Sequence, residues 1–338
     1  MPTQTTTRAF ELTDYGLDKI TIRDRQLPEL GSHDVLVKMK AVSLNYRDFL
    51  IAKGLYSRNL KLPLVPLSDG AGEIVEVGSA VSRFKRGDRV TPIFMQSWIA
   101  GQIAANDGKS ALGGAIDGVL MNEAVFNESG LVRIPDHLTF EEAATLPCAA
   151  VTAWNALFET GNIKPGSKVL TLGTGGVSIF AMQFAKAAGA LVAITSSSEE
   201  KLERAKQLGA DICINYKQNA DWDKEVLKHF PEGVDHVIEV GGAGTLDRSV
   251  KAARPGGHIS MIGRLTDGAF DPTKLLMKHL RLQGIFVGSR EMFERMNHAV
   301  DANKISPIID KGYKVEEITE ALNTLESGSH FGKIVLAF

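Results

Sequence analysis

The chain has 338 residues, with 38 basic and 40 acidic side chains and a formal net charge of −2. This length suggests two domains of ordinary size, each large enough to bury a core of its own. The near-neutral charge gives no overall attraction to nucleic acids or anionic membranes, so we expect neither as a partner. With two cysteines, Cys148 and Cys213, the chain cannot supply a disulfide framework or a zinc site of four thiolates.

The sequence shows no targeting or membrane-spanning segment. Its first ten residues lack the apolar run of a secretory signal. The uncharged stretches at residues 90–106 and 169–185 contain Pro, Gln, Asn or clustered Gly, and they fall short of the roughly 20 apolar residues that cross a bilayer. We therefore expect a cytoplasmic protein.

The first third of the sequence has the pattern of a compact β domain. Residues 35–41 alternate apolar and polar side chains, as a half-buried strand does. Residues 72–77 form a second strand-like run, which is followed by the turn pair at residues 78–79. From Phe140 an Ala-rich helical pattern extends towards Phe158, with a break at Pro147.

Strands and helices alternate in the middle of the chain. The predicted strands are residues 168–172, 191–195, 212–215, 234–240 and 258–262. The helices predicted between them are residues 177–188, 199–208 and 246–253. This alternation predicts a parallel sheet in a doubly wound α/β fold.

Beyond residue 284 the pattern is mixed. It predicts helices near residues 291–302 and 316–325 and a closing strand at residues 333–336. We therefore predict three segments along the chain: a β-rich catalytic domain at residues 1–132, a dinucleotide-binding domain at residues 133–284, and a C-terminal segment at residues 285–338 that returns to the first domain.

A glycine-rich turn follows the first strand of the alternating region. The run Gly173-Thr174-Gly175-Gly176-Val177 matches the pattern G-x-G-x-x-G, except that Ser178 takes the place of the last glycine. Gly173 permits a tight turn, Gly175 lets the backbone approach a pyrophosphate, and the following helix offers unpaired N–H groups. The turn predicts a dinucleotide site; the alternative is a glycine turn that binds nothing.

The residues after the second strand of this region bear on the choice between NAD and NADP. An NAD site usually has Asp or Glu there, roughly 20 residues beyond the turn, to accept a hydrogen bond from the ribose 2′-hydroxyl. Here the strand leads into Ser196 and Ser197, and no acid occurs before Glu199. Hydroxyl donors near Lys201 suit a 2′-phosphate, so we predict NADP(H). Alternatively, Ser197 and Glu200 form a helix capping box, and Lys201 is a solvated charge.

Taken together, these features resemble the medium-chain dehydrogenase/reductase superfamily over essentially the whole chain. The motifs that carry the resemblance are residues 68–75 (SDGAGEIV), 87–90 (GDRV), the Gly173 turn, 208–211 (LGAD) and 235–241 (DHVIEVG). The resemblance implies a GroES-like β domain, a Rossmann domain and a C-terminal segment that returns to the first domain.

The resemblance also implies where a catalytic zinc would bind, and the sequence departs from that pattern. Alcohol dehydrogenases of the superfamily bind zinc through Cys, His and Cys, with a Glu nearby. Asn45 stands at the first ligand position, Ser68-Asp69 replaces the His-Glu pair, and only Cys148 retains a ligand type. One thiolate is not a zinc site, and the loop at residues 95–113 lacks the four cysteines of a structural site. We therefore expect no zinc.

Residues 45–48 (NYRD) and 54–56 (GLY) instead resemble the zinc-free quinone oxidoreductase and enoyl reductase branch. Without a metal, hydride delivery to a quinone or a conjugated C=C is easier than alcohol chemistry, because the negative charge spreads onto a carbonyl oxygen. The candidate catalytic residues are Asn45, Tyr46, Asp48 and Tyr56, with the tyrosines and the amide as hydrogen-bond donors to the enolate. Alternatively, Tyr46 only lines the cleft, and Asp48 is a structural hydrogen-bonding partner.

Family resemblance assigns further cofactor contacts by position. It implies that Thr152 faces the nicotinamide and that Tyr216 contacts the adenosine phosphate. The other implied contacts lie at strand ends and in the C-terminal part of the chain: Val240, Gly241, Ile262, Gly263, Phe286, Val287 and Lys333. Val240 and Ile262 also fit a role as strand core.

We predict a zinc-independent, NADPH-dependent oxidoreductase that acts on quinones or α,β-unsaturated carbonyls. One alternative is a carbonyl or alcohol oxidoreductase that works without zinc. Another is a non-catalytic NADPH-binding protein with a structural or regulatory role. Residues 282–287 (LQGIFV) have the pattern of an exposed edge strand of the Rossmann sheet, so we also predict a homodimer that pairs these strands.

Overall fold

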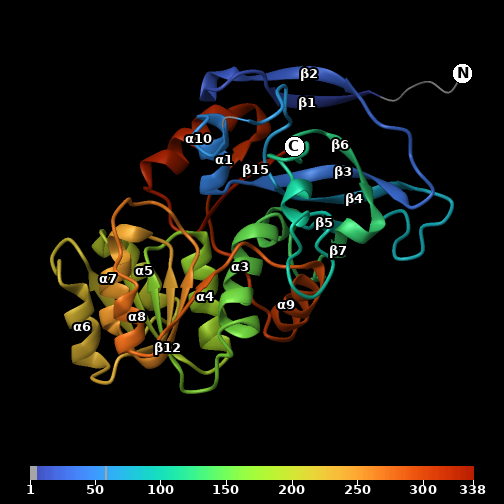
Figure 1. The fold of residues 1–338 in the computed structure, drawn as a ribbon. Helices are drawn as coiled ribbons and strands as arrows, with labels where there is room; N and C mark the ends of the chain where they lie inside the picture. Colours follow the sequence, from blue (N-terminus) through green and yellow to red (C-terminus); the bar gives the residue numbers. More distant parts are fainter. Residues whose placement is uncertain (1–5, 58) are drawn as a thin grey trace, which may run out of the picture. The chain divides into compact units, whose positions relative to one another are not determined.

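A computed structural model of the protein describes residues 6–57 and 59–338 (Figure 1). The chain divides into two compact units, and the first combines Met1–Cys148 with Gly288–Phe338. The second unit, Ala149–Val287, is thus an insertion in the sequence of the first. The sequence places the start of the second domain at residue 133, whereas the structure divides the chain after Cys148. Residues just before the division stay with the first unit, where Ser43 Oγ donates a hydrogen bond to the Ala144 carbonyl at 2.8 Å.

The first unit is built around a seven-stranded sheet with the order β14-β15-β3-β4-β5-β7, and β6 pairs with β3 beside this path. Its strands are β3 (Asp34–Ser43), β4 (Asp69–Val77), β5 (Arg89–Pro92), β6 (Glu123–Asn127), β7 (Leu131–Arg133), β14 (Ile309–Lys314) and β15 (Lys333–Ala337). A separate antiparallel hairpin joins β1 (Thr6–Leu12) to β2 (Ile20–Gln26). The α-helices are α1 (Tyr46–Ala52), α2 (Phe140–Ala143), α9 (Arg290–Ala302) and α10 (Ile318–Ser327), and short 3-10 turns occupy Leu17–Lys19, Asp107–Ser110, Glu128–Gly130 and Val315–Glu317.

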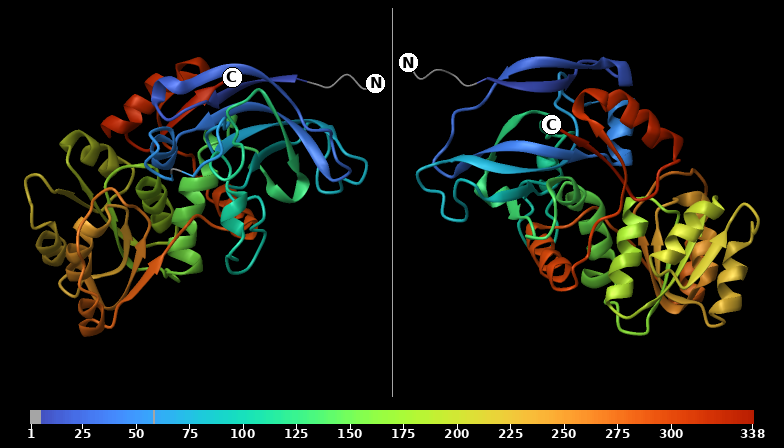
Figure 2. Two further views of the ribbon diagram at one scale, coloured as in Figure 1. Left: turned by 45° about the horizontal axis from the view of Figure 1, so that its top comes forward. Right: turned by 180° about the vertical axis from the view of Figure 1, so that it is seen from behind.

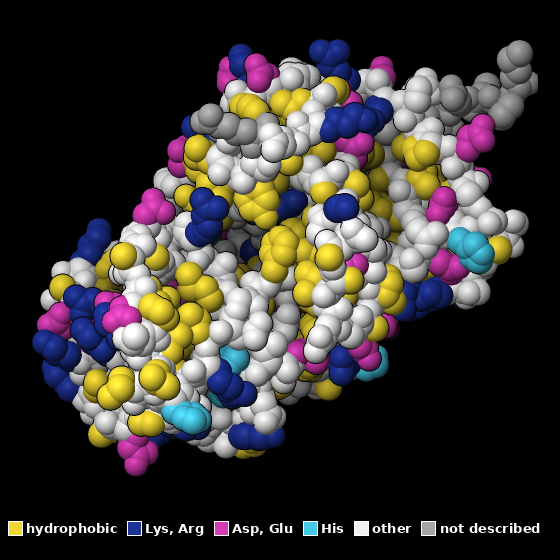
Figure 3. Space-filling model, in the orientation of Figure 1, with side chains coloured by type: hydrophobic (Ala, Val, Ile, Leu, Met, Phe, Trp, Pro, Cys, Tyr) yellow, Lys and Arg dark blue, Asp and Glu magenta, His cyan; other side chains and the backbone are white. Residues whose placement is uncertain are grey.

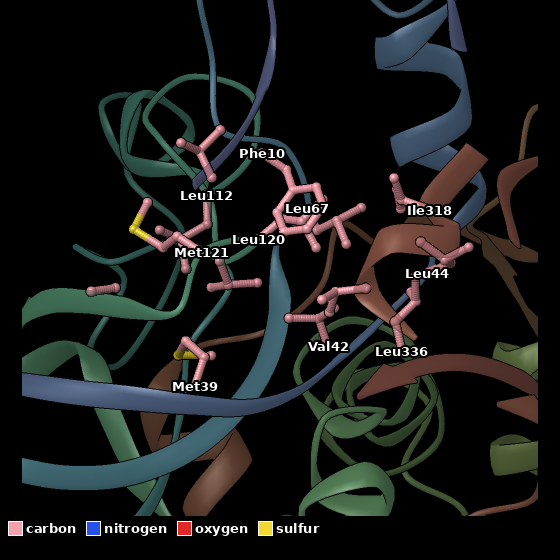
Figure 4. Close-up of a cluster of buried hydrophobic side chains, with 14 of the residues drawn as sticks. Phe10, Met39, Val42, Leu44, Leu67, Leu112, Leu120, Met121, Ile318 and Leu336 are labelled. Carbon is pink, nitrogen blue, oxygen red and sulfur yellow. The ribbon is translucent and has the colours of Figure 1, made fainter. Parts of the chain in front are cut away.

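The core of the first unit joins residues that are far apart in the sequence. Figure 4 shows Met39 and Val42 of β3 in one buried cluster with Ile318 of α10 and Leu336 of β15. β15 pairs antiparallel with β3 and parallel with β14. The C-terminal residues therefore complete a sheet and a core that begin near the N-terminus.

The second unit contains a six-stranded parallel sheet with the order β10-β9-β8-β11-β12-β13. Its strands are β8 (Lys168–Leu172), β9 (Leu191–Ser196), β10 (Ile212–Asn215), β11 (Val234–Glu239), β12 (Ala253–Met261) and β13 (Arg281–Gly284). Its helices are α3 (Val151–Trp154), α4 (Gly176–Ala187), α5 (Glu199–Gln207), α6 (Trp222–His229), α7 (Ala243–Ala252) and α8 (Thr273–Met277). The predicted fold class, a GroES-like β domain with a doubly wound Rossmann domain, is confirmed.

Helices cover both faces of this parallel sheet (Figure 2). On one face, Trp222 and Val226 of α6 and Leu246 of α7 pack in a common core with the strands. On the other, Phe184 of α4 makes an edge contact with Trp154 of α3, with ring centroids 5.8 Å apart. The strand order reverses between β8 and β11, and ligands of doubly wound folds bind at the carboxyl ends of the strands at such a point.

The helix predicted to run from Phe140 towards Phe158 is divided into short pieces. α2 ends at Ala143, and π-helical turns at Leu146–Ala150 and Asn155–Glu159 lie on either side of α3. Pro147, in the first of these turns, has no N–H to donate, which explains the break that the sequence predicts there. Within the described residues, no helix is long and apolar enough to cross a membrane.

Candidate functional site

The glycine turn of the second unit connects β8 to α4. Gly173 has a φ of +72°, a left-handed conformation that glycine adopts without strain. Gly175 is the N-cap of α4 and makes no side-chain capping bond, and a Cβ built on it would meet no atom within 4 Å. The first N–H groups of α4 therefore face open space, which fits the pyrophosphate of a dinucleotide.

Ser178 shows how the turn tolerates the loss of its third glycine. Its side chain is buried, and Oγ donates a hydrogen bond to the Leu172 carbonyl at 2.6 Å, so the hydroxyl ties α4 to the end of β8. The hydroxyl of Thr195 accepts a hydrogen bond from the Gly173 N–H at 3.2 Å. The other predicted residues complete the turn, with Thr174 buried and both Gly176 and Val177 half-buried.

The end of β9 carries the residues predicted to distinguish NADP from NAD. Ser196 is buried, and its Oγ accepts a hydrogen bond from the Ser198 N–H at 3.3 Å. The N-cap of α5 is Ser198, whose Oγ accepts from the Lys201 N–H at 3.3 Å. The alternative that Ser197 caps this helix is therefore wrong by one residue. Ser197 is half-buried, and its hydroxyl has no hydrogen-bond partner among the residues that the structure describes.

The nearest acid to the end of β9 is already engaged by a neighbouring strand. Asn215, at the end of β10, donates a hydrogen bond from Nδ2 to Glu199 Oε1 at 2.6 Å. The N–H of Tyr216 donates to the Ser196 carbonyl at 3.0 Å, and the Tyr216 side chain is 42% exposed. The structure thus brings Ser196 and Tyr216 together, as the predicted adenosine-phosphate contacts require.

Glu239 is a structural residue, beside the predicted cofactor contacts Val240 and Gly241, that the sequence analysis missed. It is fully buried at the end of β11, and Oε1 accepts hydrogen bonds from the N–H groups of Gly241 (2.8 Å) and Gly242 (3.0 Å) and from the Thr245 hydroxyl (2.6 Å). Its other oxygen accepts from the hydroxyl of Ser249. One carboxylate therefore organises the turn into α7. The sequence did contain a sign of this role, because Thr245 and Ser249, whose hydroxyls donate to Glu239, follow it by six and ten residues.

The predicted contacts at the ends of β11 and β12 lie close together. A Cβ built on Gly263 would lie 1.7 Å from the carbonyl oxygen of Val240, so only glycine fits there. The N–H of Ile262 donates to the Glu239 carbonyl at 2.9 Å, and the Ile262 side chain is half-buried. The turn that Glu239 organises therefore lies next to all four of these predicted contacts, Val240, Gly241, Ile262 and Gly263.

The last residues of the second unit include a strained position. Val287 has a φ of +60°, which is unfavourable for a β-branched side chain. Its carbonyl accepts a hydrogen bond at 2.7 Å from Nδ2 of buried Asn155, a residue the sequence analysis did not single out. Phe286 beside it is 45% exposed, and Thr152 is buried in α3.

In the first unit, the predicted catalytic residues surround the start of α1. Asn45 is the N-cap of this helix, and its N–H donates to Asp48 Oδ2 at 2.8 Å. Asp48 is buried, and this bond supports the structural alternative for its role. Tyr46 is 40% exposed, and its ring lies 5.5 Å from that of Phe49.

Arg47, in the first turn of α1, contacts Tyr56 and so connects it to the predicted catalytic residues at the start of this helix. Its guanidinium lies 5.5 Å from the ring centroid of Tyr56 and 4.6 Å from that of Phe94, and it donates to the Leu112 carbonyl at 2.9 Å. Tyr56, like Tyr46, is 40% exposed. Neither tyrosine hydroxyl has a hydrogen-bond partner among the residues that the structure describes.

A buried polar cluster lies beneath these residues. The ammonium of Lys333 donates to Asn45 Oδ1 at 2.7 Å and to the Leu44 carbonyl. Asp69 accepts a hydrogen bond from Ser68 Oγ at 2.6 Å and another from the Cys148 N–H at 2.9 Å. Lys333, predicted as a cofactor contact, is only 3% exposed, and both bonds hold its charged end inside the first unit.

The electrostatics of this cluster follow from its burial. Burial raises the pKa of Asp48 to about 6, against the neighbouring Arg47 charge. Burial also raises the pKa of Asp69 and lowers that of Lys333, while their opposite charges oppose both shifts. The charge of each group therefore stabilises the ionised form of the other.

The residues present do not fit a catalytic zinc ion. Zinc needs deprotonated sulfur, imidazole or carboxylate ligands. Burial raises the pKa of the Cys148 thiol, which disfavours the thiolate, and Asn45 and Ser68 stand in place of the other ligands. Across residues 6–57 and 59–338, no three His, Cys, Asp or Glu side chains are grouped so that they could hold a metal ion.

Comparison with known proteins assigns the family. The family model for zinc-binding dehydrogenases matches residues 176–302, and that for the alcohol dehydrogenase GroES-like domain matches residues 31–136. A zinc-type alcohol dehydrogenase-like protein of Schizosaccharomyces pombe is 46% identical, over 95% of this chain and 96% of its own length. The chain belongs to the medium-chain dehydrogenase/reductase superfamily. It is therefore an oxidoreductase that acts on small molecules.

Other members of the superfamily show a range of activities. The 2-methylene-furan-3-one reductase of Solanum lycopersicum is 32% identical over 97% of this chain and 78% of its own length. The quinone oxidoreductase of Lama guanicoe is 28% identical over 97% of each chain. A solved structure from Sinorhizobium meliloti, provisionally described as an alcohol dehydrogenase, has a TM-score of 0.92 and 40% identity over the full length of both chains.

Proposed function

We propose that this superfamily member is a zinc-independent, NADPH-dependent reductase that delivers hydride to a quinone or an α,β-unsaturated carbonyl compound. The observation that carries the proposal is the Asn45–Lys333–Asp69 cluster. Lys333 donates to Asn45, Ser68 donates to Asp69, and the cluster has a neutral amide, a hydroxyl donor and a protonated thiol where a zinc enzyme needs ligands.

The polar side chains of the first unit suit reduction of a conjugated carbonyl. When bound, NADPH supplies a hydride, which adds to the carbon β to the carbonyl and leaves negative charge on the carbonyl oxygen. Tyr46 and Tyr56 have hydroxyls that are free to donate to this oxygen, and either tyrosine or water supplies the final proton. Asp48 and Lys333 then act by positioning Asn45 and the start of α1.

The end of β9 supports NADP(H). Ser196, Ser197 and Lys201 lie at the strand end and the first turn of α5, where the 2′-phosphate of NADP(H) would bind in a Rossmann fold. The Ser197 hydroxyl is free to donate to that phosphate. The carboxylate that could accept from a ribose hydroxyl, Glu199, is bonded to Asn215.

Two relatives support the substrate class, and one supports an alternative. A 2-methylene-furan-3-one carries a C=C conjugated to a carbonyl, and its reductase is similar to this chain over most of its length. The quinone oxidoreductase is similar over the whole chain. The zinc-type alcohol dehydrogenase-like relative of Schizosaccharomyces pombe instead favours alcohol or carbonyl chemistry. Combined with the residues at the zinc-ligand positions of this chain, it gives a second candidate, a carbonyl or alcohol oxidoreductase that works without zinc.

The test combines a substrate panel with metal analysis of the purified protein. NADPH oxidation with enones and quinones, but not with a matched saturated aldehyde, is the expected result. Activity on aldehydes or alcohols alone supports the second candidate. Cofactor binding without turnover on any acceptor supports the remaining alternative, a non-catalytic NADPH-binding protein with a structural or regulatory role. Stoichiometric zinc, or equal affinity for NADPH and NADH, contradicts the corresponding part of the proposal.

We also propose a homodimer, and we retain a cytoplasmic location as a prediction. β13 is an edge strand of the six-stranded sheet, so its outer backbone groups are available to a second copy. Hydrophobic side chains gather on the visible face of the second unit in Figure 3, and Leu265, Leu276 and Met277 are all more than half exposed. Light scattering tests this prediction, and a monodisperse monomer contradicts it.

A further inference from the structure

A row of basic side chains crosses three neighbouring strands of the second unit, level with the first residue of β13. His236 of β11 is the register partner of His258 on β12, and His258 is the partner of Arg281 on β13. Register partners on parallel strands point to the same face of a sheet, so the three side chains lie side by side. Val237 packs in the core with α6 and α7, so the row lies on the opposite face.

The two histidines are buried without hydrogen-bond partners. His236 is 5% exposed and His258 is 3% exposed, and their ring centroids are 6.3 Å apart. Nδ1 of His236 and both ring nitrogens of His258 have no partner among the residues that the structure describes. Buried polar atoms of this kind cost free energy, and folded proteins rarely leave several of them together. A ligand bound beside His236 would explain why a polar ring is kept at that position.

A cavity of about 420 Å³ opens beside His236. Its lining includes Gly161, Lys164, Asp235, His236, Arg254 and Arg281. Ser167, immediately before β8, also lines it, whereas the glycine turn follows the other end of that strand. A strand of this length separates the two places by about 17 Å, so the cavity is distinct from the proposed cofactor site.

The cavity has an excess of positive charge. Its one acid, Asp235, accepts a hydrogen bond from Arg254 Nε at 2.5 Å and another from the Lys168 N–H at 2.7 Å. The guanidinium of Arg281 has no ion pair or hydrogen bond among the described residues, and Lys164 donates to the neutral amide oxygen of Asn162 at 2.8 Å. Two cations therefore remain uncompensated beside the buried imidazoles.

We propose that this cavity binds a small oxyanion, either free phosphate or the phosphate group of a larger metabolite, through Arg281, Lys164 and His236. The guanidinium and ammonium groups supply charge-assisted hydrogen bonds. His236 supplies a buried donor, and His258 beside it supplies a second imidazole that can take up a proton.

This site couples anion binding to proton uptake. Burial, with the Arg281 charge, lowers the pKa of both His236 and His258 to about 4. Arg254 lowers the pKa of His236 further, and Asp235 opposes this shift. A bound anion raises both pKa values, so affinity increases as pH falls towards 4. The increase is about tenfold per pH unit for each proton taken up.

Histidine NMR of the full chain tests the proposal, with sulfate as a probe that stays a dianion from pH 5 to 8. At constant ionic strength, sulfate is expected to shift the His236 and His258 resonances, which are assigned with the His236→Gln and His258→Gln variants. Arg281→Gln is expected to weaken binding at least tenfold. Lys251→Gln, which removes the same charge from an exposed position outside the cavity, is the matched control.

Two further measurements complete the test. Tighter binding of glycerol phosphate than of inorganic phosphate identifies a phosphorylated metabolite as the ligand, whereas equal binding identifies the free anion. NADPH affinity of Arg281→Gln is expected to equal that of the wild type, which separates this site from the cofactor site. Histidine resonances that do not move with sulfate, or that move equally in Arg281→Gln, overturn the proposal.

Discussion

The ammonium group of Lys333 donates a hydrogen bond to the side-chain oxygen of Asn45 at 2.7 Å, across 288 residues of sequence. Because lysine can only donate, this bond fixes which end of the Asn45 amide faces β15. The amide's NH₂ group is left to donate elsewhere. The last strand of the first unit thus sets the orientation of a residue at the start of α1, where the predicted catalytic side chains lie.

Replacement of Lys333 by methionine is expected to lower the free energy of unfolding by about 3 kcal/mol, because it leaves Asp69 buried without its counter-charge. The double variant Lys333→Met/Asp69→Asn is expected to recover part of this loss. Denaturant unfolding measures both effects. Lys251→Met is the exposed control, and a Lys333→Met variant no less stable than this control contradicts the prediction.

Replacement of Ser197 by aspartate is expected to reverse the cofactor preference. The carboxylate would repel a 2′-phosphate and could accept from a ribose hydroxyl, so the KM for NADPH should rise at least tenfold, or about 1.4 kcal/mol. Ser197→Ala should weaken NADPH binding less and leave NADH binding unchanged. Steady-state kinetics with both cofactors provide the measurement. An unchanged ratio of KM values in Ser197→Asp would rule out this role.

Replacement of Glu239 by glutamine is expected to destabilise the turn that leads into α7. Hydrogen bonds to a carboxylate are worth more than those to an amide, and the NH₂ end would face donors, so we expect a loss of about 2 kcal/mol. NADPH affinity should fall as well, because Val240 and Gly241 belong to this turn. Thermal unfolding and cofactor titration measure the two effects. Glu232→Gln, at an exposed position before β11, should change neither.

Asp48 is expected to make stability depend on pH. Burial raises its pKa from an ordinary 3.8 to about 6, so between these values the folded chain binds a proton that the unfolded chain has lost. Its contribution to stability therefore falls as pH rises from about 4 to 6, by up to about 3 kcal/mol, and is constant above that range. Asp48→Asn does not titrate, so its stability relative to the wild type should improve from pH 4 to 7. A flat difference in urea unfolding contradicts this.

The sequence located the strands of the second unit, because they are apolar runs with turn signals between them, but it missed α6 and α8 and the first residues of β12. β8 was predicted with the bounds that the structure shows, Lys168–Leu172. The β1–β2 hairpin was not predicted. In β2 (ITIRDRQ) the apolar alternation stops at Ile22 and the remaining four residues are polar, so the pattern is too short to indicate a strand.

Candidate-site residues were harder to place when their role depends on tertiary contacts. Both Ser197 and Ser198 are good N-cap residues, and only the backbone geometry selects Ser198. Lys333 was predicted as a cofactor contact, but the pairing of β15 with β3, which one sequence does not reveal, buries its ammonium beside Asn45. The row from His236 to Arg281 likewise requires the register of three strands.

The insertion of the second unit into the first has a consequence for synthesis of the chain. Ribosomes release residues from the N-terminus onwards, and domains generally fold as units. The second unit is complete once Val287 has emerged, whereas the sheet of the first unit still lacks β14 and β15. The part of the protein translated first is therefore the last to finish folding. Until residues 335–337 arrive, the last residues of β3 (41–43) have no partner on the side where β6 pairs with residues 34–38, and this part of the strand is open to chaperones or to aggregation.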